Sequence, residues 1–160
     1  GLPGGRLLTM SWRRVLLSAA GLLAFVYGAA YVDLVLRARS SYLEGEKWLE
    51  WSRRPELKKA HFDGIFAARE VELARERDSG RLSAAASDKK LGLARFERDQ
   101  AVAESSLKYA YVWFQSAAEL FTPPESRWVV LSRGRMKETR ALWKKELDAK
   151  KVPYRDYMLD

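Results

Sequence analysis

Few side chains in this sequence have the type and spacing that catalysis or metal binding requires. The 160 residues include no cysteine and a single histidine, His61, which excludes disulfides, thiolate nucleophiles, iron–sulfur clusters and cysteine-ligated zinc within them. His61 has no second histidine at ligand spacing, so we interpret it as a packed or hydrogen-bonded side chain and not as a general base. Phosphate-binding loops and nucleophile elbows are also missing. We therefore expect no enzyme activity, no metal site and no cofactor.

Asp33 is the one charged residue inside the longest apolar stretch of the sequence. A carboxylate in hydrocarbon is costly, and where one persists it often takes part in proton transfer. Arg37 follows four residues later, a spacing that places both side chains on one face of a helix and allows them to pair. We favour an ion pair between Asp33 and Arg37 at the membrane interface over a proton relay.

This apolar stretch predicts a single transmembrane helix over residues 15–36. Residues 15–32 carry no charge, and a helix over 15–36 would rise about 33 Å, close to the roughly 30 Å thickness of a bilayer core. Arginines flank both ends, as is common at membrane interfaces. The alternative is a cleavable signal peptide, because small residues at 28–30 follow an apolar run.

One side of the predicted membrane helix is lined by small residues. Ala20, Ala24 and Gly28 recur every four positions, with Gly21 beside them. Without bulky side chains, the backbones of two helices can approach closely in lipid, where van der Waals contact drives their association. We expect this strip to pack on a transmembrane helix of another protein subunit.

The remaining sequence has a helical rhythm and no convincing strand alternation, so we predict an all-α fold. A helical stalk would continue from the membrane, because no strong turn signal precedes Pro55. Trp48 and Trp51 on this stalk could contact lipid headgroups, a partner or the rest of the domain, and we favour packing. The predicted divisions are an N-terminal segment 1–14, the transmembrane helix 15–36, the stalk 37–54, a helical hairpin 55–121, a third, basic helix 122–151 and an extended tail 152–160.

The predicted hairpin consists of two helices that are joined near Asp78, Ser79 and Gly80, a sequence typical of a helix end. The second helix should run over 87–121, because its apolar residues follow alternating three- and four-residue steps, interrupted by Gln100, like the seam of a coiled coil. These residues are Leu93, Phe96, Ala103, Leu107, Ala110, Phe114, Ala117 and Phe121. Each helix has one apolar face and the link is short, which favours antiparallel packing.

The third helix should begin at a proline-rich stop. Thr122 is expected to cap it, with two prolines in the first turn and Glu125 completing a capping box. Most of the net charge lies on this helix, since the nine basic and three acidic residues of 127–151 account for +6 of the net charge of +8.

We expect six of these basic residues to form one surface: Arg133, Arg135, Lys137, Arg140, Lys144 and Lys145. A cationic surface suits anionic lipid or an acidic protein partner. Nucleic acid ranks last among the partners, because no known nucleic-acid-binding module accompanies the charge. A helix face that contacts only solvent is the remaining alternative.

The tail holds four side chains that suit docking on another surface: Tyr154, Tyr157, Met158 and Leu159. The tail has too little apolar surface to fold alone, and fixing the backbone of each residue costs about 1–2 kcal/mol in entropy. We expect these side chains to bind a partner protein, and an unattached tail is the alternative.

These features favour a noncatalytic, single-pass accessory subunit of a multi-subunit inner-membrane complex, energy-transducing in type, that contributes to assembly and stability. The alternative is a stand-alone membrane-tethered adaptor or periplasmic scaffold. Basic residues flank the membrane helix on both sides, so the positive-inside rule discriminates weakly, and we place the larger domain on the periplasmic or intermembrane side. The expected partners are other membrane-protein subunits and the lipid bilayer.

Overall fold

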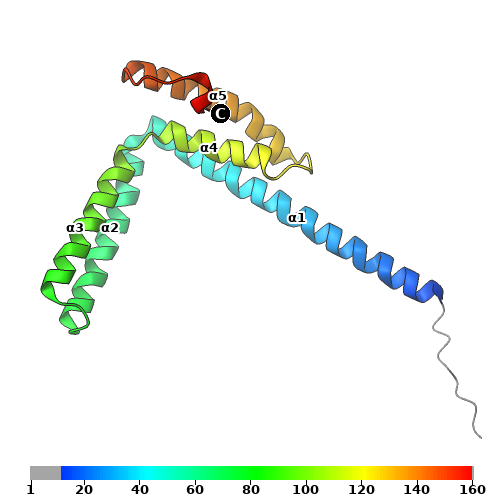
Figure 1. Cartoon of the computed structure of the whole chain (residues 1–160), viewed down its shortest axis with the longest axis horizontal. Helices are drawn as coiled ribbons and strands as arrows, with labels where there is room; N and C mark the ends of the chain where they lie inside the picture. The colour runs from blue at the N-terminus through cyan, green and yellow to red at the C-terminus, as the bar shows by residue number, and fades with distance from the viewer. Residues whose placement is uncertain (1–11, 160) are drawn as a thin grey trace, which may run out of the picture.

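The computed structural model describes residues 12–159, and within this range the chain consists of helices and their links (Figure 1). In chain order the elements are α1 (Trp12–Arg53), α2 (Pro55–Asp78), α3 (Ala84–Ala103), α4 (Ser106–Glu119), α5 (Arg127–Ala149) and the short 3-10 helix η1 (Asp156–Leu159). The predicted all-α fold is therefore confirmed. Most of the predicted N-terminal segment, residues 1–11, and Asp160 of the tail lie outside the described residues.

Helix α1 joins the predicted membrane segment and the predicted stalk in one uninterrupted helix of 42 residues. Its first half is exposed, burial begins at Leu34, and Ala38 is the first residue to be fully buried. Pro55 ends the helix, because proline lacks a backbone N–H and disfavours helical conformation in the residue before it. In the described part of the chain, α1 is the one helix that is long and apolar enough to cross a membrane.

The second half of α1 packs with α4 and α5 into a three-helix bundle. Its core is formed by Leu49, Ala110 and Phe114, surrounded by the half-buried Tyr42, Trp48, Leu107, Met136 and Leu142. Tyr109 lies beside Trp48, and Phe114 lies beside Tyr42, so α4 runs antiparallel to α1. A helix as short as α4, with 14 residues, is marginal in isolation. Packing between α1 and α5 therefore stabilises it.

Helices α2 and α3 form an antiparallel hairpin, which we call the arm, and Figure 1 shows the arm diverging from the bundle. In the link, Gly80 takes φ +72°, a left-handed conformation that favours glycine. Ser83 caps α3, since its hydroxyl accepts a hydrogen bond from the backbone N–H of Ala86 at 3.2 Å. The arm contacts the bundle at one end only, near the junction of α1 and α2.

The helix that we expected over 87–121 is divided in the structure. Helix α3 ends at Ala103, Glu104 is extended, and Ser105 caps α4 by accepting a hydrogen bond from the backbone N–H of Lys108 at 3.2 Å. Serine at a cap is a local start signal that the apolar spacing concealed. The hairpin therefore ends at residue 103, and the prediction of one helix to residue 121 was wrong.

The apolar residues along this divided region serve two different interfaces. Leu93 and Phe96 stay 57% and 58% exposed on α3. Phe114 and Ala117, in contrast, are fully buried in the bundle. Because apolar spacing does not reveal which neighbour a helix face will meet, the break could not be recognised from the spacing alone.

Helix α5 begins at Arg127 and not at the proline pair. Its cap is Ser126, which is extended (φ −71°, ψ 160°) and whose hydroxyl lies 3.4 Å from the backbone nitrogen of Val129. Thr122 donates a hydrogen bond to Glu125 within the loop, at 3.4 Å, and both prolines follow cis peptide bonds. The predicted cap at Thr122 was wrong, because a second capping residue one turn later starts the helix.

Candidate interaction surfaces

The end of α1, the start of α2 and the start of α4 meet at a corner filled by aromatic rings. Trp48 stacks on Tyr109 with 4.6 Å between ring centres and meets the edge of Trp51 at 4.8 Å. The buried Trp51 also contacts His61, at 5.0 Å, and Phe62, at 6.0 Å, on α2. Packing of both tryptophans is thus confirmed, and His61 takes part in the same cluster. These rings join the arm to the bundle.

Lys58 is buried at this corner, with 3% of its surface exposed. Its ammonium group donates hydrogen bonds to the backbone carbonyls of Val102, at 3.1 Å, and Glu104, at 2.5 Å, and lies 5.5 Å from the ring centre of Trp48. The last carbonyls of a helix lack partners within it and carry partial negative charge, so this lysine caps the end of α3. Burial lowers the pKa of Lys58, although the negative charges of Glu104 and Glu146 act to raise it.

Gly45 allows the ring of Phe114 to lie directly against the backbone of α1. A Cβ atom at position 45 would stand 2.6 Å from that ring, which is itself completely buried. Glycine is the residue that leaves room for such a contact. Neither Gly45 nor Lys58 was among the predicted site residues, because each acts through residues on a distant segment that the local pattern does not identify.

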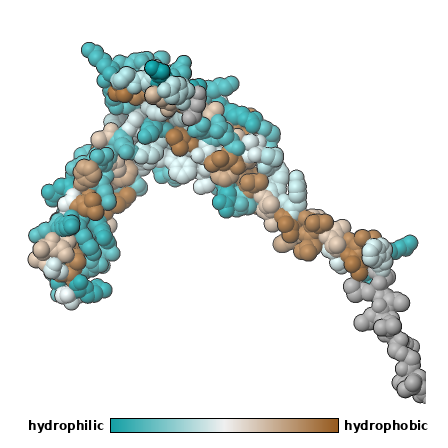
Figure 2. Space-filling model, viewed as in Figure 1, coloured by the Kyte–Doolittle hydropathy of each residue, from teal (hydrophilic) through white to brown (hydrophobic). Residues whose placement is uncertain are grey.

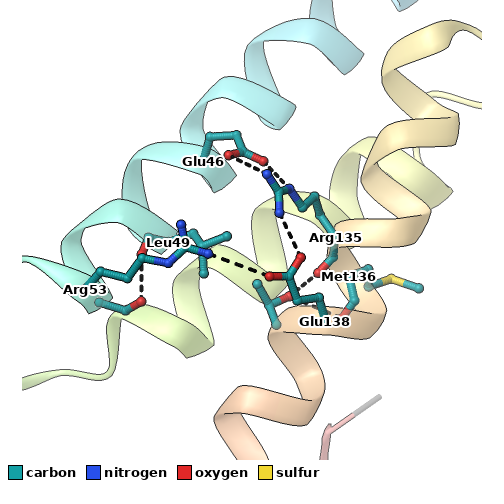
Figure 3. A network of polar contacts seen from close by, with 8 residues as sticks. Glu46, Leu49, Arg53, Arg135, Met136 and Glu138 are labelled. Atoms are coloured by element: carbon teal, nitrogen blue, oxygen red, sulfur yellow. Dashed lines mark hydrogen bonds and ion pairs between the residues drawn. The ribbon is translucent and has the colours of Figure 1, made fainter.

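A polar network joins α1 to α5 (Figure 3). Arg135 reaches both carboxylate oxygens of Glu46, with Nε 2.6 Å from Oε1 and Nη2 3.3 Å from Oε2. Its Nη1 donates to Glu138 at 2.8 Å, and Glu138 in turn lies 3.7 Å from Nη2 of Arg53. The hydrogen bond to Glu138 makes the largest contribution to the raised pKa of Arg135. Arg135 therefore binds the bundle together and is not a free cationic contact.

The basic residues predicted to form one surface are mostly engaged within the chain. Arg133 donates to both oxygens of Glu125, at 2.6 Å each, and this contact lowers the pKa of the Glu125 carboxyl. Internal partners hold four of the six residues, namely Arg133, Arg135, Arg140 and Lys144, whereas Lys137 and Lys145 are exposed. The structure therefore does not bring the six residues together as one free basic surface.

Part of the tail folds back on α5 through Asp156. Lys144 Nζ lies 2.6 Å from the Asp156 carboxylate, and Arg140 donates to the Asp156 carbonyl at 3.1 Å. The hydrogen bond from Lys144 lowers the pKa of Asp156. Tyr154 is half-buried, and this burial, followed by a hydrogen bond to Asp148, raises the pKa of its phenol. The chain's own helix thus supplies the surface on which these residues lie.

The end of the tail divides into covered and uncovered side chains. Leu159 in η1 is 4% exposed, whereas Tyr157 and Met158 are mostly exposed. The premise that only a partner could order the tail was wrong, because contacts with α5 offset part of the entropy cost. Binding of Tyr157 and Met158 to a partner stays a prediction.

An open groove of about 430 Å³ lies between the two helices of the arm. Its lining is mainly apolar with a charged rim, and consists of Phe62, Ile65, Phe66, Arg69, Lys90, Leu93, Ala94, Glu97, Arg98 and Ala101. Arg98 bridges the helices, with Nη1 3.0 Å from Oδ1 of Asp63. Figure 2 shows hydrophobic residues exposed along this arm among hydrophilic ones. The sequence predicts Leu93 in the seam between two helices, and its spacing does not reveal that this seam stays open as a groove.

The small residues of the predicted membrane helix are uncovered in the structure. All four are exposed: Ala20, Gly21, Ala24 and Gly28. Figure 2 shows hydrophobic residues along this half of α1. At its end, Arg37 Nε lies 2.7 Å from Oδ2 of Asp33, so the structure contains the expected pair. It stays a prediction that this pair lies at a membrane interface. It also stays a prediction that the small residues pack on another helix.

Residues 12–159 contain no group of three histidine, cysteine, aspartate or glutamate side chains that could hold a metal ion. No family model, curated protein or solved structure matches the chain. Three surfaces of the described residues are both apolar and exposed: the first half of α1, the groove of the arm, and Tyr157 and Met158 at the end of the tail.

Proposed function

We propose that this chain is a noncatalytic, single-pass accessory subunit of a multi-subunit inner-membrane complex, in which it supports assembly and stability. The observation that carries the proposal is the division of α1 into two halves with different surroundings. In the first half of this uninterrupted helix, the most apolar stretch contains no buried residue. The second half contributes Leu49 to the core of the bundle.

Lipid is the environment that suits the first half of α1. Leu17, Leu23 and Phe25 are each more than two thirds exposed, and contiguous apolar surface of this kind marks a membrane or protein contact. A helix also satisfies its own backbone hydrogen bonds, as the bilayer core requires. The candidate cleavage residues 28–30 lie inside the same helix that enters the bundle, which supports a retained anchor over a cleaved signal peptide.

The arm supports the second part of the proposal, which is binding to another subunit. Across residues 55–103, Leu73 is the one hydrophobic residue that is buried, so the two helices leave apolar surface without a neighbour. Their groove suits the apolar face of a third helix. The basic residues on its rim are each paired within the chain, Arg69 with Glu72, Lys90 with Glu76, and Arg98 with Asp63 and Asp99. The partner that we propose is an amphipathic helix of a neighbouring subunit, which would bury its apolar face in the groove.

Purification of the full chain from its native membranes in a mild detergent tests this function. We expect the chain to stay with the membrane fraction after alkaline washing and to co-purify with other membrane proteins at a fixed stoichiometry. Release of the chain by the wash would contradict the anchor. Recovery from the membrane as a single species without stoichiometric partners would instead favour the stand-alone adaptor.

A matched pair of substitutions connects this test to the groove. Leu93→Glu places a charge in the apolar lining, which a partner helix would have to desolvate, so we expect co-purification to fall several-fold. Val112→Glu, on an exposed position of α4 that does not line the groove, is the control. Equal loss in the two variants, with helical content retained in both, would exclude the groove as the docking site.

A further inference from the structure

The register of α4 on α1 brings the loop between α4 and α5 to the end of the predicted membrane segment. The rings of Phe114 and Tyr42 pack with 5.7 Å between their centres. The six residues from Phe114 to Leu120 cover about 9 Å of helix, and the same distance along α1 leads from Tyr42 back to Leu36. Figure 1 shows the loop beside α1, on the side from which the apolar half of α1 extends.

The surface at this level combines an apolar residue, an aromatic ring and two arginines. We call it the membrane-proximal patch, and it consists of Arg39, Leu120, Arg127 and Trp128. Leu120 is 69% exposed at the end of α4. The guanidinium groups of Arg39 and Arg127 lie 5.8 Å and 5.5 Å from the centre of the Trp128 ring. Trp128 in turn packs on Tyr42, at 5.5 Å, which holds the patch on the bundle.

We propose that the membrane-proximal patch binds the phospholipid headgroups of the leaflet from which α1 emerges, and so gives the bundle a second contact with the bilayer. The inference rests on the proposed function, because it requires α1 to cross the membrane. Leu120 enters the boundary between headgroups and acyl chains, Trp128 occupies the interface that its ring favours, and the arginines bind headgroup phosphates.

The charges around the patch support phosphate as the ligand. Arg37 pairs with Asp33 at 2.7 Å and Arg133 pairs with Glu125 at 2.6 Å, so neither pair contributes net charge. Glu119 is one more acidic residue at this end of α4. Its single negative charge is outnumbered by the two positive charges of Arg39 and Arg127. The patch is therefore net positive, and anionic phosphate groups at the membrane surface are attracted to it.

Site-specific labelling tests the proposal, because the chain has no cysteine of its own. Single cysteines at Leu120, Leu22 and Lys145 would each carry an environment-sensitive fluorophore on the full chain in nanodiscs of phosphatidylcholine, alone or mixed with phosphatidylglycerol. Position 22 reports the span, and position 145 lies on α5 about 27 Å beyond Arg127 along the helix. We expect blue-shifted emission and several-fold weaker quenching by iodide at positions 22 and 120 than at 145.

The three positions separate the two proposals. If position 120 is quenched as strongly as 145 while 22 is protected, the patch does not touch the bilayer and the inference fails, although the anchor stands. If position 22 is itself accessible to iodide, α1 does not cross the bilayer, and both proposals fail.

Charge reversal at the patch gives a second readout. Arg39→Glu with Arg127→Glu should raise iodide quenching at position 120 several-fold, whereas the control pair Lys137→Glu with Lys145→Glu should leave it unchanged. An equal change in the two double variants would show that only total charge matters and would overturn the assignment of the patch. Circular dichroism establishes that each variant retains its helical content.

Discussion

The three-helix bundle and the arm are both made of amphipathic helices, yet they bury their apolar residues to very different degrees. In the bundle, Leu49, Phe114 and Val129 are almost completely buried. In the arm, Ile65 and Leu93 remain more than half exposed. A helix in a three-helix bundle meets two neighbours and can cover a broad apolar face, whereas a helix in a hairpin meets only one. The bundle thus stabilises itself, and the arm retains surface for a partner.

The largest test of this comparison is the removal of one phenylalanine ring from each region. Phe114→Ala should lower the free energy of unfolding by about 3–5 kcal/mol, because it leaves a cavity in a closed core. Phe96→Ala in the arm should change it by less than about 1 kcal/mol, because that ring is already exposed. Denaturant titration of the full chain in detergent, followed by circular dichroism, measures both. Similar losses would mean that the two regions do not differ in packing as described.

A second test separates the arm from the bundle at the corner. Lys58→Met removes the donor for the carbonyls of Val102 and Glu104, and we expect a loss of about 1–3 kcal/mol together with faster hydrogen exchange at the end of α3. The neighbouring Lys59 is an exposed residue that pairs with Asp63 at 2.5 Å. Lys59→Met should cost little. Equal effects of the two variants would show that Lys58 is not the link that we describe.

A third test contrasts two glycines and predicts opposite signs. Gly45→Ala forces a methyl group against the Phe114 ring, and we expect a net loss of about 1–2 kcal/mol after the gain in helix propensity is subtracted. Gly64→Ala in the arm meets no atom within 4 Å and should stabilise the chain by about 0.5–1 kcal/mol. Thermal unfolding gives both signs. Stabilisation by Gly45→Ala would mean that the bundle core can accommodate the methyl group.

The smallest expected effect concerns the tail. Lys144 lowers the pKa of Asp156, so their contact is present at neutral pH and is lost as the pH falls through that lowered pKa. Asp156→Asn should mimic the acidic state at neutral pH, with faster amide hydrogen exchange in η1 and no measurable change in the bundle. The intrinsic rate of amide exchange itself changes with pH. If acidification changes exchange in η1 of the unaltered chain only as much as it changes that intrinsic rate, the Lys144 contact does not hold the tail.

Much of the secondary structure could be predicted from the sequence, because it depends on interactions between neighbours along the chain. The uncharged run of residues 15–32 produced the exposed apolar half of α1, Pro55 ended that helix, and Gly80 lies in the link of the arm as expected. The same local spacing placed Asp33 and Arg37 within bonding distance. The start of α5 is also set by neighbours along the chain, but it was not predicted correctly. Thr122 and Ser126 are both capping residue types, one turn apart, and only Ser126 caps the helix.

Only the tertiary structure decided which faces meet. Arg135 finds Glu46 across 89 residues of sequence, and Lys58 finds the end of α3 across more than 40. Contacts between distant segments also decided that α4 packs on α1, that four of the six predicted basic residues have partners within the chain, and that the α4–α5 loop lies at the level where α1 loses its apolar surface. The physical reason is that helix periodicity identifies an apolar face but carries no information about the face that it will meet. That choice depends on the fit of side chains such as Gly45 and Phe114 in three dimensions.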